Sequence, residues 1–365
     1  MEPRRKILII CPYPVNKAPS QRLKYEQYFD DWKMNGFEIT TSPFMSNYFY
    51  NIAYKNGRFL QKIALTVWGH IVRLYDIMRA PSYDIVYVHL WVTPFGLPIY
   101  EWLISRVNRN IIFDIDDLIF LNPASQANSW VSKLKKSRKC FYLMRVAKQV
   151  IVCTPYLEQI AKLYNNEVTD ISSTVDTEKY RITNEYENTG IIKLGWSGSS
   201  STGKYLRLLE PVFAELVKIT RVQLVVIGDA NFRSDFIEVI HVPWAAESEV
   251  ADLGKIDIGL YPLPDEEWVM GKSGLKAIQY MAMGIPTVAT DIGANARVIE
   301  HEKSGFLVQS KEEWIEKILL LCSRPDIRKS IGLEARKRVE KLFSIHTNKD
   351  KYLKVLRSFP ATSQL

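Results

Sequence analysis

Residues 271–291 carry the stretch Gly-Lys-Ser-Gly-Leu-Lys-Ala-Ile-Gln-Tyr-Met-Ala-Met-Gly-Ile-Pro-Thr-Val-Ala-Thr-Asp. Its start, rich in glycine and lysine, predicts a loop that opens a helix of about ten residues. Gly284 and Pro286 predict the end of that helix, because glycine accepts a left-handed conformation there and proline cannot continue a helix. Thr287–Ala289 predicts a buried strand. The stretch therefore has the loop, helix and strand order of an α/β domain.

The same loop has the chemistry of a phosphate site. Backbone N–H groups at a helix N-terminus face the positive end of the helix dipole, and Lys272 and Lys276 add mobile positive charge there. Gln279 follows Lys276 by about one helical turn, where its amide can bond sugar or ribose hydroxyls. The alternative is an ordinary connection with solvated lysines, because short loops of this composition are weak signals.

Two other loops of the same half are expected at the same sheet edge. The first, Ser197–Lys204, combines glycines, hydroxyls and a lysine just before a helix, which suits a diphosphate. It has the spacing of a Walker A loop, but Tyr205 stands where the magnesium-binding hydroxyl is required, so an NTPase is disfavoured. The second is Gly228-Asp229-Ala230.

Length and composition limit the class of protein. A chain of 365 residues predicts two domains, and 47% hydrophobic with 24% charged residues is ordinary for a globular protein. The net charge of +8 suits an anionic partner: a nucleotide, nucleic acid or an acidic membrane surface. Four scattered cysteines without a C-x-x-C pair indicate a reduced, cytoplasmic setting. No signal peptide or transmembrane segment is predicted, since 59–78 contains charged residues.

Two series of strands and helices divide the chain. We predict a first Rossmann-like domain over 1–180 and a second over 181–343, with a C-terminal helix at about 344–360 that packs back on the first. The first turn lacks G-x-G-x-x-G, which disfavours a dehydrogenase. The predicted strands of the first domain are 6–10, 37–41, 84–90, 111–115 and 150–153, and its predicted helices include 20–35, 94–107 and 155–164.

Polar and basic groups mark the first domain. His89 and the pair Asp116-Asp117 follow predicted parallel strands, at the edge where ligands bind. The segment 45–78 interleaves aromatic and basic residues, so it is either an interfacial helix or a helix that packs in the core with a solvated basic face. The basic run 133–139 is most simply a solvated helix face.

These motifs resemble glycosyltransferase family 4, whose members are retaining enzymes of the GT-B fold: two Rossmann-like α/β domains with parallel sheets that face each other across a cleft. The resemblance covers nearly the whole chain and is stronger in the second half. It rests on Gly195-Trp196-Ser197-Gly198 with Lys204, on Val225 to Gly228, on Asp257 to Leu263, on 271–289, on Ser304 to Val308, and on Val175 to Tyr180, which is similar to the interdomain segment of these enzymes.

One departure from the family pattern concerns the sugar. Relatives commonly carry two glutamates at the positions of Gly271 and Gln279, where the first contacts the donor sugar and the second the ribose. Gln279 can still bond hydroxyls, but without the strength of a charged group. The sequence resembles a subgroup with G-K-x-G-x-K-x-x-Q-Y-M. The resemblance implies donor contacts from nine residues: Gly198, Ser199, Gly228, Asp229, Ser273, Gly274, Leu275, Lys276 and Gln279.

The resemblance also implies catalytic roles. Lys204 and Lys272 are expected to stabilise the leaving diphosphate without a metal or other cofactor. His89, Asp116 and Asp117 are expected to orient the acceptor, and Lys17 and Arg22 to contact the acceptor or a donor phosphate. The D-x-D spacing of Asp114 and Asp116 leaves metal binding as an alternative.

The expected function is transfer of a sugar, with retention, from a nucleoside diphosphate sugar to a glycan or lipid-linked glycan acceptor in surface polysaccharide or glycoconjugate synthesis. We expect a cytoplasmic protein in peripheral contact with anionic membrane, and no nucleic-acid partner. Two alternatives stay open. One is a non-catalytic GT-B-like protein that binds sugar nucleotides, and the other is a GT-B epimerase or phosphorylase.

Overall fold

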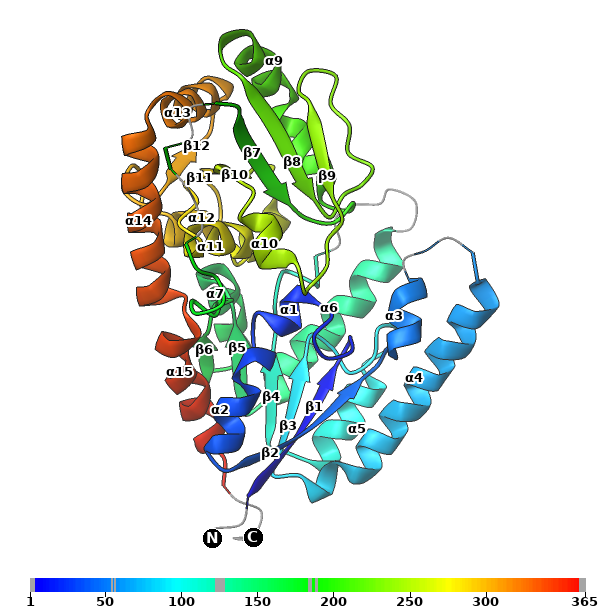
Figure 1. Ribbon diagram of the computed structural model, residues 1–365. Coiled ribbons are helices and arrows are strands. Elements are labelled where there is room, and N and C mark those ends of the chain that lie inside the picture. The colour runs from blue at the N-terminus through cyan, green and yellow to red at the C-terminus, as the bar shows by residue number, and fades with distance from the viewer. Residues whose placement is uncertain are drawn as a thin grey trace. The chain divides into compact units, whose positions relative to one another are not determined.

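The computed structural model describes residues 4–53, 55, 57–121, 129–182, 186–187 and 190–360, with the side chains of 129–137 excepted. It divides into two compact units. Unit 1 comprises Met1–Ser173 with Asn348–Leu365, and unit 2 comprises Thr174–Thr347. Each contains a six-stranded parallel sheet with helices around it, shown in Figure 1. The side chains of residues 133–137 in the basic run, and Tyr54 of the aromatic segment, lie outside what is described.

The sheet of unit 1 has the order β2-β1-β3-β4-β5-β6, and every neighbouring pair is parallel. Strands β1 and β3 to β5 are apolar on both faces, as expected for strands buried between helices. The strands are β1 (Arg5–Cys11), β2 (Phe37–Pro43), β3 (Ile85–His89), β4 (Ile111–Asp114), β5 (Gln149–Val152) and β6 (Val168–Asp170).

Helices cover both sides of this sheet. Figure 1 shows α4 and α5 together on one side and α2 with α15 on the other. On the second side the rings of Trp32 and Tyr352 lie 5.6 Å apart, so the C-terminal helix completes the core of unit 1. The helices are α1 (Pro19–Arg22), α2 (Phe29–Met34), α3 (Asn47–Ala53), α4 (Phe59–Arg79), α5 (Ile99–Val107), α6 (Ser129–Val146), α7 (Pro155–Lys162) and α15 (Ile345–Arg357).

Unit 2 repeats the plan with the order β12-β11-β10-β7-β8-β9. Its central strands are β7 (Ile192–Ser197), β8 (Val222–Ile227), β10 (Ile258–Tyr261) and β11 (Thr287–Thr290), flanked by β9 (Val239–Val242) and β12 (Phe306–Val308). Its helices are α8 (Gly203–Leu206), α9 (Glu210–Ile219), α10 (Glu249–Leu253), α11 (Leu275–Ala282), α12 (Asn295–Val298), α13 (Lys311–Ser323) and α14 (Pro325–Leu342).

The helix predicted over 94–107 is observed from Ile99 only, and two other predictions differ more. The helix expected over 20–35 is broken into α1, a 3₁₀ turn at Glu26–Tyr28 and α2, because Gln21, Lys24 and Glu26 turn inward to bond other segments. The segment 45–78 forms two helices, since Gly57 and Arg58 adopt left-handed φ values of 79° and 54° between them. Strand β6 and helix α12 were not predicted. No described helix has the length and apolar character needed to span a bilayer.

Candidate functional site

In unit 2, two loops at the carboxyl edge of the sheet are held together by close packing. Gly228, just after β8, has φ +98°, and a Cβ there would lie 2.5 Å from the carbonyl oxygen of Gly198. A Cβ on Gly203 would collide with the Asp229 carboxylate, which accepts a 3.0 Å hydrogen bond from Ser200 Oγ. The loops after β7 and β8 therefore form one surface that only glycine permits at these positions.

This packing predicts a measurable cost for Gly228→Ala. Alanine would have to adopt the left-handed φ of Gly228, and its Cβ would clash with the Gly198 carbonyl oxygen. The free energy of unfolding should therefore fall by about 2–4 kcal/mol. Gly36→Ala is the matched control, because Gly36 has φ +89° but open space around its Cβ position. It should cost only about 1–2 kcal/mol, because only the left-handed φ disfavours alanine there. Urea denaturation followed by circular dichroism measures both, and equal losses would contradict the packing account.

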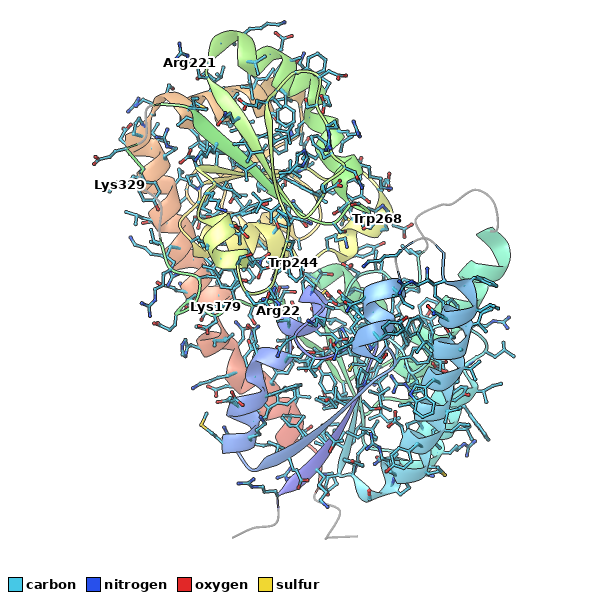
Figure 2. The ribbon with its side chains drawn as sticks, turned by 45° about the vertical axis from the view of Figure 1, so that its right-hand side comes forward. Arg22, Lys179, Arg221, Trp244, Trp268 and Lys329 are labelled. Atoms are coloured by element: carbon cyan, nitrogen blue, oxygen red, sulfur yellow. The ribbon has the colours of Figure 1, made fainter. Side chains whose placement is uncertain are left out.

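The two lysines predicted to stabilise a diphosphate lie over two neighbouring aromatic rings. Lys204 Nζ lies 5.1 Å from the centre of the Tyr205 ring, and Lys272 Nζ lies 5.2 Å from that of Trp268. The two rings are themselves 5.4 Å apart. Trp268, labelled in Figure 2, thus joins the loop before α11 to the start of α8. The Lys204 ammonium group thus lies over the Tyr205 ring, and the Lys272 ammonium group lies over the neighbouring Trp268 ring.

The start of α11 adds donors to the same edge. Gly274 caps the helix with φ +75°, and its first turn carries no acidic residue. The first N–H groups of a helix have no acceptor within that helix, so they can face an anion. Lys276 Nζ lies 5.6 Å from the Trp196 ring and 5.5 Å from the Tyr261 ring. The remaining predicted donor residues Ser199, Ser273 and Leu275 lie in these loops or at this helix start.

Gln279 belongs to a buried hydrogen-bonded chain. Its Nε2 donates to Tyr180 Oη at 3.1 Å, and Tyr180 donates to Glu249 Oε2 at 2.6 Å. The other oxygen of Glu249 accepts from Trp244 Nε1 at 3.0 Å. Trp244, labelled in Figure 2, is 37% exposed and its Cβ lies beside Gly228. The Trp244 indole is thus fixed by its hydrogen bond to Glu249, lies beside Gly228 and keeps part of its surface exposed.

In unit 1, the carboxyl edge of the sheet is built on buried charges. Lys24 and Asp114 form an ion pair that has no exposed surface. Burial alone would raise the pKa of Asp114, but Lys24 outweighs it and holds that pKa at about 2. Tyr87 donates to Asp114 Oδ2 at 2.5 Å, and His89 Nδ1 lies 3.4 Å from the same oxygen. Asp114, half of the D-x-D alternative, is thus surrounded by protein groups.

His89 is buried completely beneath this edge. Its ring lies 5.1 Å from that of Tyr25. It has no exposed surface with which to orient an acceptor by direct contact. Asp116 is almost buried, and burial raises its pKa. Asp117 is partly exposed and has φ 61°.

Strained backbone marks the same edge. Asn16, Leu90 and Asp117 have φ values of 64°, 61° and 61°, and they follow β1, β3 and β4. Such conformations are rare outside glycine, above all for leucine, and persist only where the surroundings enforce them. Three of them at the ends of three strands support a functional role for this edge.

The predicted residues Lys17 and Arg22 lie in and after the loop that follows β1. Lys17 is exposed and Arg22, labelled in Figure 2, is 9% exposed in α1. Gln21 holds the loop by accepting from Tyr13 N at 2.9 Å and donating to Glu26 Oε1 at 2.9 Å. Glu26 Oε2 accepts from the amide of Asn16 at 2.8 Å.

Several of these groups were not predicted. The sequence pattern predicts Lys24 and Glu26 only as parts of a continuous helix, and it identifies Tyr180 only as part of an interdomain motif. Trp244, Glu249, and Trp268 gave no signal in the sequence beyond their residue types. Their partners are between five and 99 residues away, so only the fold brings them together.

Comparison with known proteins supports the reading of unit 2. Residues 192–324 match the family described as Glycosyl transferases group 1. The trehalose synthase of Pyrococcus horikoshii is 34% identical over 85 residues, 23% of this chain and 20% of that protein. That of Thermococcus litoralis is 33% identical over 86 residues, 24% of this chain and 21% of that protein. The chain thus spans about a fifth of the length of the curated relatives it matches.

Solved structures are similar over nearly the whole chain. Sucrose-phosphate synthase from Thermosynechococcus elongatus has a TM-score of 0.67 at 15% identity, covering 97% of this chain and 99% of that one. Anabaena HepE, solved in complex with UDP-glucose, has a TM-score of 0.70 at 14% identity, covering 97% and 100%. The predicted α/β fold of the GT-B class is confirmed, and residues 192–324 carry the glycosyl transferases group 1 match within it.

Proposed function

We propose that the chain is a retaining glycosyltransferase of family 4, which transfers a sugar from a nucleoside diphosphate sugar to a glycan or lipid-linked glycan. The observation that carries the proposal is the joining of Lys204 and Lys272 through Tyr205 and Trp268, beside glycine loops and the start of α11. Positive charge and N–H donors at a helix start suit a diphosphate. The group 1 domain match supports a glycosyltransferase.

The donor nucleotide would use the rest of this edge. The exposed face of Trp244 offers a flat surface on which a base can stack, since its indole N–H is already held by Glu249. By the family resemblance Gln279, whose amide donates to Tyr180, would contact the ribose hydroxyls. A uridine diphosphate sugar is our first choice, because HepE was solved with UDP-glucose.

The chemistry requires charge stabilisation and a route for one proton. The acceptor hydroxyl oxygen forms a bond to the anomeric carbon on the face from which the diphosphate leaves, and the bond from that carbon to the phosphate oxygen breaks. The acceptor proton passes to the departing phosphate oxygen. Lys204, Lys272 and the loop amides stabilise the negative charge that develops there, without a metal in this proposal.

The acceptor would lie against unit 1, with Asp117 and Lys17 at its exposed edge. His89 and Asp116 are buried below this edge. They would hold the surrounding loops in place rather than contact the acceptor. We propose a cytoplasmic role in surface polysaccharide or glycoconjugate synthesis.

A ligand screen tests the proposal. Thermal unfolding of the full chain should shift upward with UDP or UDP-glucose, by about 2.7 kcal/mol of added stability when the ligand is present at a hundred times its Kd. Donor hydrolysis, followed as UDP release, should persist in EDTA, because lysines supply the charge. Loss of hydrolysis in EDTA would favour the alternative in which Asp114 and Asp116 hold a metal. No shift with any sugar nucleotide would refute the proposal.

A non-catalytic binding protein is the second candidate. It is favoured by Gly271, which has no side chain to contact a donor sugar. In that case the melting shift with UDP-glucose appears but neither hydrolysis nor transfer to any glycan acceptor is detected.

A further inference from the structure

Helix α4 turns an apolar stripe toward solvent. Its 21 residues, Phe59–Arg79, form a helix about 30 Å long. Six apolar residues recur along it at spacings of three and four, the period of one helix face, and they are 45–80% exposed: Leu60, Ile63, Val67, Ile71, Leu74 and Met78. A stripe of this kind normally faces a core.

The opposite face of α4 is buried and includes an ion pair, Arg73 with Asp76, beside Gly69 and Ile77. Arg73 donates to the carbonyl oxygens of Cys11, Ser42 and Val92 at 2.8, 3.1 and 2.7 Å, and to Asp76 Oδ2 at 2.8 Å. Neither side chain of the ion pair has exposed surface. Hydrogen bonds and close packing, not apolar contact alone, therefore attach α4 to unit 1. The sequence left open a helix that packs its apolar face in the core, but in the structure that face is exposed.

Neighbouring elements also carry exposed apolar side chains. Helix α5 lies beside α4, as Figure 1 shows, and the His70 ring of α4 lies 5.2 Å from the Tyr100 ring of α5. Trp102 in α5 and Phe95 in the loop before it are 45% and 67% exposed. We name this surface, formed by α4, α5 and that loop, the α4–α5 face. Contiguous exposed apolar surface marks an interaction site.

The exposed charged side chains of the segment 45–110, which contains the α4–α5 face, are mainly cationic. Between residues 45 and 110 the acidic residues are Asp76, Asp84 and Glu101. Asp76 and Glu101 are buried, and Asp84 accepts a 2.7 Å hydrogen bond from the amide of Lys6. In the same range Lys55, Arg58, Arg106 and Arg109 are exposed. The apolar surface thus has a cationic margin.

Some of these cations pair with aromatic rings, as is common where an apolar surface meets water. The Arg106 guanidinium lies 5.5 Å from the centre of the Trp102 ring, and that of Arg79 lies 4.9 Å from the Tyr75 ring. Tryptophan, tyrosine and arginine prefer the boundary between a bilayer and water.

We propose that the α4–α5 face docks on the surface of a bilayer that contains anionic lipid, with α4 lying in the plane of the interface. An apolar stripe with flanking cations is the composition of an interfacial helix. A second copy of the chain is a poorer partner, because a symmetric contact would place the cationic margins against each other. This inference concerns unit 1 alone and does not depend on the donor site of unit 2.

Vesicle co-sedimentation of the full chain tests it. The wild type should pellet with vesicles of phosphatidylcholine and phosphatidylglycerol, and less with phosphatidylcholine alone or at high salt. The triple variant Val67→Gln, Ile71→Gln and Leu74→Gln should bind at least about tenfold more weakly, because it removes three apolar groups from the interface. Its melting temperature should be unchanged, since these side chains are exposed.

The matched control changes three exposed apolar residues elsewhere: Leu163→Gln, Leu208→Gln and Ile219→Gln. It should pellet like the wild type. Wild-type protein that stays in the supernatant, or a triple variant that pellets as well as the control, would overturn the proposal. Light scattering without vesicles adds a further outcome: a wild-type dimer that the triple variant converts to monomer would assign the face to a second copy instead.

Discussion

Replacing Lys204 and Lys272 together by alanine should lower the rate of sugar transfer by about four orders of magnitude or more. Removing one group that stabilises transition-state charge typically costs about 10²- to 10³-fold in kcat. Because Lys204 and Lys272 are carried on adjoining rings, both are expected to face the same leaving diphosphate. Each single variant should therefore lose about 10²-fold.

The control for this experiment is Lys218→Ala with Lys311→Ala. Both lysines are largely exposed in unit 2, and each pairs with Glu215. Transfer should be unchanged in that variant, and circular dichroism should show that both double variants are folded. Transfer at the wild-type rate in the Lys204 and Lys272 double variant would remove the basis of the proposed donor site.

Asp114→Asn should lower the free energy of unfolding by about 3–5 kcal/mol, because it leaves Lys24 as an unpaired buried charge. Lys24→Met combined with Asp114→Asn should be more stable than Asp114→Asn alone, since that charge is then absent. The exposed pair of Lys33 and Asp30 supplies the control, and Asp30→Asn should change stability by less than about 1 kcal/mol.

The same ion pair predicts a pH dependence. The pKa of Asp114 is about 2 in the folded chain and 3.8 without its surroundings, so its stabilising contribution is present above about pH 4. That contribution is lost as the pH falls from about 4 to about 2. The pKa of Lys24 is raised in spite of burial, so Lys24 stays charged throughout this window. The stability difference between wild type and Asp114→Asn should shrink on acidification, and a constant difference would contradict the assignment.

The sequence predicts best where one local pattern suffices. Continuous apolar runs such as Ile7 to Ile10 and Leu224 to Ile227 predict buried parallel strands, and both are observed. Gly284 and Pro286 correctly predict the end of α11 before β11. Parallel order then brings the loops to the carboxyl edges of their sheets.

Other features depend on distant parts of the chain. Helical spacing in α4 identifies an apolar face but not the side on which it lies, because the partners of Arg73 come from three separate segments. Similarly, the apolar spacing of 20–35 predicts a continuous helix, yet buried bonds from Gln21 and Lys24 break it. The pairing of Tyr205 with Trp268 spans 63 positions and has no local signal.

The outward stripe of α4 also bears on how unit 1 folds. Hydrophobic collapse gathers apolar faces, but most of the apolar surface of α4 remains in water at the end of folding. The acceptors of Arg73 lie at Cys11 at the end of β1, Ser42 in β2 and Val92 after β3, so they come together only when these three strands are paired. We therefore expect α4 to take its final place only after β1, β2 and β3 have paired.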